Sequence, residues 1–428
     1  TSHTAMASSA QTRSPRSPGL NRHMQNAVLI ATMIGLFSEA ARVRAGFDVK
    51  LFYGIVLVCL PAVVWVWDFT LPLRYLLFLG YLWISGILSC LLLDASPKSF
   101  LLEAIGITVC SFYFLLFFRY QDRTLDELFS VYAAFAFWIS VLGFPICALQ
   151  SLHKHTFVGV QSITLEPAHF CQLVIPAFFY YASSAAHSRR CRRRALIILA
   201  AVLASLATTG YIVIVLGCIF LYRRHRMKLI LVTLLLLPLL TGLYLGSEHF
   251  RIRIDDSISG LVKNDLSGVN ISTYAFISNV YVTQQTFLLH PLLGTGLGSY
   301  AVDHDKYAAD VPGMAAFNRE VVYTLNAKDA NSLGLRTAAE FGMVGLTGII
   351  WLLIRYRPAD EAPYSAIGFA TLLYLFLKLF REGNYFTPEM YFFVWAYLFS
   401  SARYRLKATS PAPALNPVIS ITTPQSAT

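Results

Sequence analysis

The chain has 428 residues, of which 56% are hydrophobic and only 13% are charged, and its formal net charge is +11. A soluble protein needs about a quarter charged residues to cover its surface, so an arrangement of two or three soluble domains is excluded. The composition predicts an integral membrane protein, in which an excess of Lys and Arg first marks the cytoplasmic side and does not by itself indicate nucleic acid.

The two ends of the chain are predicted to be disordered cytoplasmic tails, over residues 1–24 and 408–428. The first is rich in Ser, Pro and Arg and lacks the arrangement of a cleavable signal, and the second is rich in Pro. The seven cysteines all fall in or beside apolar runs, so no disulfide framework is indicated.

Apolar runs long enough to cross a membrane recur along the chain. A hydrocarbon core of about 30 Å requires roughly 20 apolar residues per helix. Ten runs meet this requirement, near 25–41, 51–67, 74–93, 100–118, 128–149, 170–186, 229–246, 332–354, 364–380 and 389–403.

The apolar stretch 195–222 is flanked by basic clusters on both sides, with five Arg before it and three Arg and one Lys after it. A helix that crosses once cannot have both ends in the cytoplasm. We therefore expect two short helices that meet at Thr208-Thr209-Gly210, recessed into the outer half of the membrane. This pair places 20 Lys and Arg in short cytoplasmic segments against 6 outside, whereas a single crossing gives 12 against 14.

The predicted fold class is an all-α polytopic integral membrane protein with about 12 transmembrane helices and both termini in the cytoplasm. Helices 1 to 9 are expected within residues 25–246, and helices 10 to 12 within residues 332–407. Residues 247–331 then form one large periplasmic loop, and loops of that length usually have a function. The sequence shows no inverted repeat of the kind found in many transporters.

Glu166 and His169 are candidates for catalysis on the outer side. They lie three residues apart at the start of a predicted helix and so share a face. Ionisable groups near a membrane are costly, which favours a function for them. The alternative is that Glu166 only starts the helix, because Pro167 suits a first turn and a carboxylate favours the positive end.

Four arginines on the same side are candidates to bind an anion. Arg336 stands four residues before Glu340, and mutual neutralisation is the alternative for this pair. Arg251 and Arg253 either bind an anion or anchor a helix end among lipid head groups. Arg381 lies in a short outer turn, and a function is favoured for it.

The glycines Gly294, Gly296 and Gly298 follow His290, and no strand precedes them. This context argues against a nucleotide-binding loop, and nucleotides are scarce outside the cytoplasm. A tight turn that packs the loop onto the membrane helices is expected instead. Asp303-His304-Asp305 offers one His and two carboxylates in a solvated loop, which seldom hold a metal ion, so neither a metal nor another cofactor is predicted.

Three segments carry a resemblance to a known family. They are Pro291-Leu-Leu-Gly294-Thr-Gly296-Leu-Gly298-Ser-Tyr300, then Asn331-Ser332 with Ala339-Glu340-Phe341-Gly342-Met-Val-Gly345-Leu346, and Arg381-x-Gly383-x-Tyr385-Phe386. These segments resemble the O-antigen ligase and Wzy-type polysaccharide polymerase superfamily. The Glu166-Pro167-Ala168 element and the Arg381 element are more similar to the polymerase branch.

The resemblance implies a glycosyltransferase-C-like fold and a reaction at the outer face of a bacterial inner membrane. A glycan on an undecaprenyl diphosphate carrier is transferred to the next lipid-linked repeat unit, without a nucleotide sugar, a metal or another cofactor. The implied partners are the undecaprenyl-diphosphate-linked donor and acceptor and the lipid bilayer, with a repeat-unit flippase and a chain-length regulator nearby. No nucleic acid is among them.

Two positions depart from the family pattern. Asn331 stands where the ligases carry a histidine, and Thr209 replaces the arginine of a Ser-Arg-Gly turn. We therefore expect Glu166, and His169 second, to deprotonate the acceptor hydroxyl. Arginine matches phosphate oxygens, so the diphosphate is expected at Arg381, Arg336, Arg251 or Arg253. The remaining expected substrate-loop residues are His290, Gly294, Gly296, Gly298, Asn331, Glu340 and Tyr385.

Two other functions stay open at this stage. An O-antigen ligase would transfer the glycan to a lipid A core sugar by the same chemistry. A transporter or flippase belongs to another class, and it would carry repeat symmetry or charged residues paired near the membrane midplane. The polar residues of this sequence are expected to gather toward one side instead.

Overall fold

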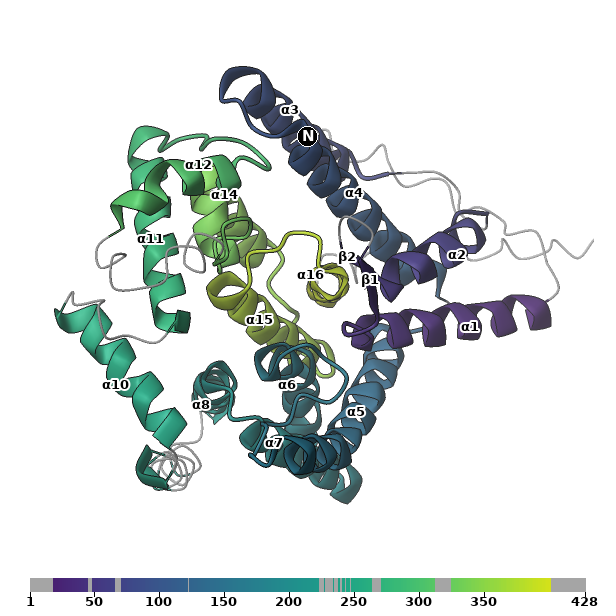
Figure 1. Cartoon of the computed structure of the whole chain (residues 1–428). Coiled ribbons are helices and arrows are strands. Elements are labelled where there is room, and N and C mark those ends of the chain that lie inside the picture. The colour runs from purple at the N-terminus through teal and green to yellow at the C-terminus, as the bar shows by residue number, and fades with distance from the viewer. Residues whose placement is uncertain are drawn as a thin grey trace, which may run out of the picture.

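The computed structural model describes residues 18–44, 48–65, 71–121, 123–222, 248–263, 271–311 and 325–401, with scattered positions between 227 and 246. The described chain is predominantly helical (Figure 1), as the all-α prediction requires. One short antiparallel hairpin, β1 (Arg42–Arg44) with β2 (Asp48–Lys50), was not expected. The helices are α1 (Pro18–Phe37), α2 (Leu51–Trp65), α3 (Leu73–Leu92), α4 (Pro97–Tyr120), α5 (Leu125–Lys154), α6 (Pro167–Ser183), α7 (Arg189–Ala204), α8 (Thr208–Tyr222), α10 (Glu248–Lys263), α11 (Ile271–Leu289), α12 (Tyr300–Tyr307), η1 (Ala308–Asp310), α14 (Leu333–Arg355), α15 (Tyr364–Arg381) and α16 (Pro388–Ser400).

Five helices in the described part of the chain are long and apolar enough to cross a membrane, namely α3, α4, α5, α14 and α15. This fits a multi-pass α-helical membrane protein. The expected count of 12 spans is wrong on this measure. α2 and α8 are apolar but shorter than a span. α7 opens with five Arg, and α16 has only 13 residues. The span expected at 229–246 and most of both predicted tails lie outside the described residues, and α1 begins at residue 18, within the first predicted tail.

The stretch 195–222 forms two antiparallel helices, α7 and α8, as expected. The Arg194 guanidinium donates to the Tyr181 hydroxyl at the start of α7, and Ser205 lies 3.1 Å from the Cys171 thiol at its end, so α7 is antiparallel to α6. Gly210 then packs on Cys171 at the start of α8. The break falls at residues 205–207, where the Ser205 hydroxyl accepts from the backbone N–H of Ala207.

Side-chain contacts sort the helix ends into two sets at opposite ends of the bundle. At one end, which we call the acidic end, the contacts join Glu39 to His169, Glu103 to Arg336, Tyr53 to Phe386 and Lys378 to Glu382. At the other, the basic end, they join Arg123 to Asn26, Tyr180 to Asp126, Arg194 to Tyr181 and Arg74 to Tyr356. Consecutive helices therefore alternate in direction, as they do in a multi-pass membrane protein.

The segment 247–331, predicted as one large loop, is largely helical where it is described. α11 packs along α14 through a small core of Val282, Tyr300, Ala330 and Ala339. The Tyr300 hydroxyl donates to Asn279 at 2.7 Å and fixes the start of α12 on α11. α10 lies at the edge of the molecule (Figure 1), so the part of this segment that packs on the bundle is α11, the glycine turn and α12.

Candidate functional site

The glycine turn 294–298 is bound to the backbone of α14. The N–H groups of Thr295 and Gly296 donate to the carbonyls of Ala339 and Glu340, at 3.0 and 2.7 Å. Gly294 and Gly296 have φ of +65° and +90°, and a Cβ on Gly294 would lie 2.4 Å from the carbonyl carbon of Glu340. Only glycine fits such a turn, so the expected tight packing turn is confirmed.

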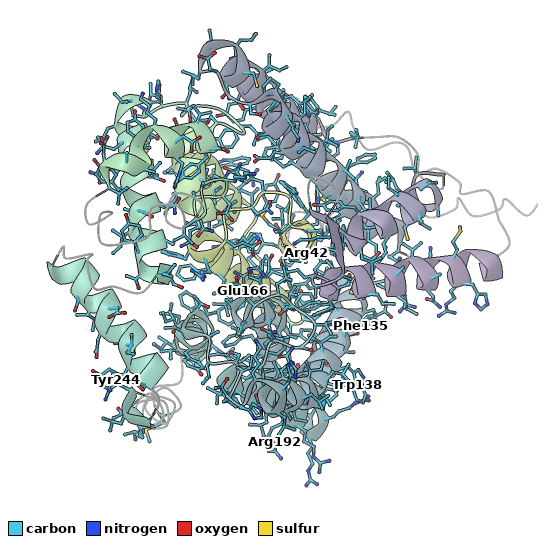
Figure 2. All side chains as sticks on the ribbon, in the orientation of Figure 1. Arg42, Phe135, Trp138, Glu166, Arg192 and Tyr244 are labelled. Atoms are coloured by element: carbon cyan, nitrogen blue, oxygen red, sulfur yellow. The ribbon has the colours of Figure 1, made fainter. Side chains whose placement is uncertain are left out.

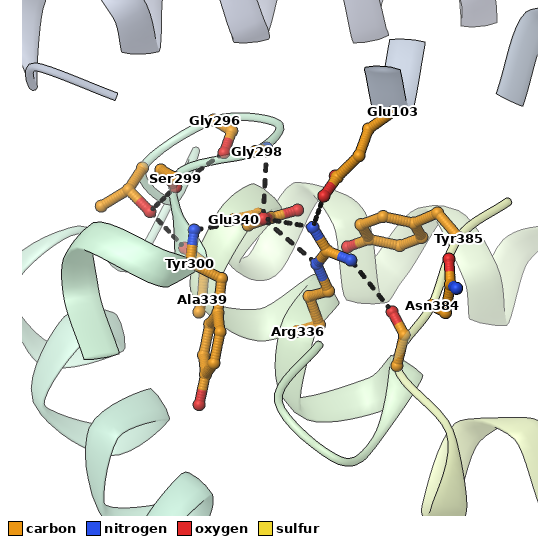
Figure 3. Close-up of polar contacts among 12 residues, drawn as sticks. Glu103, Gly296, Gly298, Ser299, Tyr300, Arg336, Ala339, Glu340, Asn384 and Tyr385 are labelled. Carbon is orange, nitrogen blue, oxygen red and sulfur yellow. Dashed lines mark hydrogen bonds and ion pairs between the residues drawn. The ribbon is translucent and has the colours of Figure 1, made fainter. Parts of the chain in front are cut away.

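Arg336 lies beneath this turn and is 2% exposed (Figure 3). Its Nη2 donates to Glu103 on α4, and its Nε and Nη2 each lie 3.2 Å from one oxygen of Glu340. Its Nη1 donates to the Gly383 carbonyl at 3.3 Å, and the guanidinium carbon lies 4.5 Å from the centre of the Tyr385 ring. All three nitrogens of this guanidinium thus donate hydrogen bonds inside the protein.

Glu340 joins the glycine turn to Arg336. The same oxygen that meets the arginine also accepts the backbone N–H groups of Gly298 and Tyr300, both at 3.2 Å, and the residue is fully buried. One carboxylate therefore collects donors from α14 and from the turn before α12. Three segments that are distant in sequence (294–300, 336–340 and 383–385) meet at this joint, which we call the Arg336 joint (Figure 3).

Arg381 lies at the rim of the Arg336 joint and is half-buried. Its Nη1 donates to the Asn331 side-chain oxygen at 3.3 Å. Asn331 is 4% exposed and has φ of +56°, and its side-chain nitrogen has no hydrogen-bond partner among the described residues. Gly383 follows, and a Cβ there would lie 1.4 Å from the Asp329 carbonyl oxygen. The close approach of two backbones holds Arg381 in place.

A second ionic cluster lies at the same end, where the turn after α1 meets α6. Oε1 of Glu39 is 2.9 Å from Nδ1 of His169 and 3.5 Å from Nζ of Lys50. Burial opposes both charges, but the Glu39 hydrogen bond and nearby carboxylates raise the pKa of His169 to about 9. In the same way, His169 and Lys50 outweigh burial and lower the pKa of Glu39 to about 2.

The end of α15 extends this cluster. Nζ of Lys378, fully buried, is 2.7 Å from Oε1 of Glu382. Burial favours the neutral acid, but Lys378, His169 and Lys50 together lower the pKa of Glu382. Because Glu382 directly follows Arg381, this cluster and the Arg336 joint are adjacent along one stretch of chain.

Glu166 is exposed directly before the first residue of α6, near the centre of the view in Figure 2. It is the N-cap residue, but its side chain accepts no capping hydrogen bond. A carboxylate that only starts a helix is expected to accept an N–H group of the first turn. A purely capping role for Glu166 therefore has less support, although its carboxylate still interacts favourably with the helix dipole.

The remaining predicted residues lie apart from these clusters. Arg251 is exposed on α10, and the Arg253 side chain lies outside the described residues. His290 is half-buried at the end of α11. Asp303 is buried and accepts from the Thr295 hydroxyl at 2.8 Å, and burial raises its pKa to about 6. Within the described residues, no group of three or more His, Cys, Asp or Glu is arranged to hold a metal ion.

The sequence analysis did not select Glu39, Lys50, Glu103 or Lys378. Glu103 and Lys378 are single charges in apolar helices, and the high cost of such charges was a usable signal. Glu39 falls at the end of the apolar run 25–41, and Lys50 lies between this run and the next, where a charge is unremarkable. Their importance depends on the hairpin, which the sequence analysis did not predict.

No protein-family model matches the chain, and no curated protein matches it. The fold and the two ionic clusters define the class of protein as a multi-pass α-helical membrane protein with a charged site at one end of its helix bundle.

Proposed function

We propose that this protein polymerises lipid-linked glycan repeat units, transferring the growing glycan from its polyprenyl diphosphate carrier to the next lipid-linked unit at the outer face of a bacterial inner membrane. One observation supports this best: the three segments that carry the family resemblance meet at the Arg336 joint, with Arg381 at its rim. Such convergence is expected of a shared site and is not expected of a chance match in sequence.

The contacts suggest a division of roles among the predicted residues. All three guanidinium nitrogens of Arg336 already donate within the protein, so we assign it to hold the joint together and not to bind phosphate. Arg381 is half-buried beside Asn331 and is our main candidate for the diphosphate. His169 carries a positive charge at neutral pH because its pKa is about 9, which suits a donor to phosphate and not a base. Glu166 is the candidate base.

The proposed step is a single inverting displacement. The acceptor hydroxyl oxygen forms a bond to the anomeric carbon as the bond from that carbon to the diphosphate oxygen breaks. The electron pair leaves with the diphosphate, whose growing charge is met by Arg381 and His169. The hydroxyl proton passes to the Glu166 carboxylate. No nucleotide or redox partner is needed for this balance.

The position of the charges bears on the alternative of a transporter. Arg336 is the fourth residue of the 23-residue helix α14, and Lys378 lies three residues before the end of α15. These paired charges sit at helix ends and not at the middle of the helices. A midplane site, which a transporter would favour, has less support than a site at one membrane face.

The product that accumulates when the gene is deleted tests the proposal. A polymerase deletion should leave single lipid-linked repeat units and no long glycan, and a plasmid copy should restore the polymer. An Arg381→Ala copy, present at normal level, should not restore it. Long glycan retained on the lipid carrier would indicate a ligase instead, and normal glycan would refute both enzymes.

A further inference from the structure

Glu39 lies in the turn between α1 and β1, and two backbone hydrogen bonds of the residues that follow it fix this turn. The backbone N–H of Ala40 donates to the Ile163 carbonyl at 3.3 Å, in the segment before α6. The N–H of Leu51 donates to the Ala41 carbonyl at 2.8 Å and closes the hairpin. The turn is thereby fixed against the start of α6, where His169 lies.

The hairpin also decides which cation lies beside Glu39. Arg42 pairs with Lys50 across β1 and β2, so Lys50 returns to the position where the turn began. Its Nζ is 3.5 Å from Oε1 of Glu39, the oxygen that His169 also contacts. The other oxygen, Oε2, is buried without a hydrogen-bond partner among the described residues. His169 and Lys50 thus both contact one oxygen of this carboxylate.

The contact with Glu39 fixes which nitrogen of His169 donates to the carboxylate. An ionised carboxylate only accepts hydrogen bonds, so Nδ1 of His169 must be the donor across the 2.9 Å contact. Nε2 is then the ring nitrogen left for another partner. The His169 side chain is 23% exposed, whereas that of Glu39 is 9% exposed, so the ring and not the carboxylate can meet a ligand.

We propose that Glu39 is the positioning residue of the site: it orients His169 and keeps the ring charged, so that Nε2–H donates to an oxygen of the leaving diphosphate. This rests on the function proposed above. Glu39 itself does not touch the substrate. The arrangement parallels the general use of a carboxylate to fix the orientation of a working imidazole.

Other charges around His169 act in the same direction but more weakly. Glu382 at the end of α15 and Glu166 at the start of α6 both raise the pKa of His169, and neither is hydrogen-bonded to the ring. Lys50 is a cation that contacts the same oxygen of Glu39. Removal of the Glu39 charge should therefore leave a buried imidazole that has lost its hydrogen-bonded carboxylate and keeps only the charges of Glu382 and Glu166.

The first experiment measures the titration of His169 without any substrate. The full chain, labelled with nitrogen-15 in histidine, is titrated in lipid nanodiscs, and the His169 signals are assigned by their loss in His169→Gln. We expect the wild-type ring to titrate near pH 9. Glu39→Gln should lower that midpoint, because burial still disfavours the charged ring while the hydrogen bond to a carboxylate and its charge are gone.

Asp360→Asn is the matched control, because Asp360 is an exposed carboxylate in the turn before α15 and should leave the His169 titration unchanged. Glu39→Asp is a conservative variant that should recover part of the shift. It also provides a test if Glu39→Gln does not fold. A His169 midpoint that is the same in wild type, Glu39→Gln and Glu39→Asp would overturn the proposal.

The second experiment measures polymer formation in membranes across pH. With Glu39 present, the rate of polymer formation should fall as pH rises through about 9. In Glu39→Gln this fall should occur at a hydroxide concentration that is at least tenfold lower. If wild-type membranes make no polymer, the proposed function fails while the titration still tests the Glu39–His169 pair. If they do make polymer and Glu39→Gln has an unchanged pH profile, the positioning role is refuted.

Discussion

Arg336 and Glu340 lie one turn apart on α14, both almost fully buried, with two nitrogens of the arginine each 3.2 Å from the same carboxylate oxygen. The sequence left two interpretations of this pair, anion binding and mutual neutralisation. Mutual neutralisation describes the contact that the two side chains make in the structure. The pair does more than cancel charge, because Glu340 also holds the N–H groups of Gly298 and Tyr300. Loss of either member should loosen α12 as well as α14.

Arg336→Met should destabilise the protein strongly. The substitution leaves Glu103 and Glu340 buried without their shared cation, and breaking a buried ion pair in this way costs about 3 to 5 kcal/mol. We expect a large fall in the apparent melting temperature of the detergent-solubilised protein. Arg251→Gln, at an exposed position on α10, is the control and should change it little. Equal melting temperatures for the two variants would contradict the structural role of Arg336.

Gly383→Ala should be the most damaging of the small glycine substitutions at the site. A Cβ at this position would lie 1.4 Å from the Asp329 carbonyl oxygen, so one of the two backbones has to move. The displacement should reach Arg381 and lower both folded yield and polymer formation. Gly348→Ala is the matched control on α14, where a Cβ meets nothing within 4 Å, and Ala should stabilise the helix by up to about 1 kcal/mol. A Gly383→Ala protein as stable as Gly348→Ala would contradict this packing.

The helices and the polar end of the bundle were predictable from the sequence, because apolar length and basic flanks are local signals. The pair α7 and α8 was inferred from two Arg clusters alone, and the break falls within three residues of the predicted Thr208. The count of spans was not predictable in this way. Length decides whether a helix crosses a membrane, and α16 has only 13 residues.

The partners within the site could be predicted only in part. Arg336 and Glu340 are neighbours on one helix, so periodicity was enough to pair them. Glu103 reaches Arg336 from α4, more than 200 residues away in sequence, and no local pattern encodes that contact. His169 was found, but its contact with Glu39 depends on how the β1–β2 hairpin docks on α6. Long-range packing was thus the missing information.

The α7–α8 pair should return to the side from which it enters. Single cysteines at Ser188 and Tyr222, in a variant without the native cysteines, should react with an impermeant maleimide from the same side of sealed vesicles. A cysteine at Lys154, at the end of α5 and at the opposite end of the bundle, should react only from the other side. Labelling of Ser188 and Tyr222 from opposite sides would show that residues 189–222 cross the membrane once.

Glu166→Gln and His169→Gln should affect the reaction in different ways, if the proposed roles hold. Loss of a general base lowers the rate by about 10²–10⁴ while donor binding is retained. Loss of the His169 charge removes a diphosphate contact, so donor binding should weaken as well. The measurement is polymer formation and retention of lipid-linked donor in purified membranes. Both variants with full activity would contradict the assignment of this end of α6 to catalysis.

Asp303→Asn should stabilise the protein at pH 8 but not at pH 4. Burial raises the pKa of Asp303 from 3.8 to about 6, so the folded state binds a proton more tightly than the unfolded state does. Stability from this group is therefore present at low pH and is lost as pH rises from about 4 to 6. The loss at neutral pH is about 2 to 3 kcal/mol, at 1.36 kcal/mol for each pKa unit. The asparagine removes the buried charge and can still accept from the Thr295 hydroxyl. Apparent melting temperatures across pH check this, with the exposed Asp310→Asn as control; a gain that is equal at pH 4 and pH 8 would contradict the titration of Asp303 as its cause.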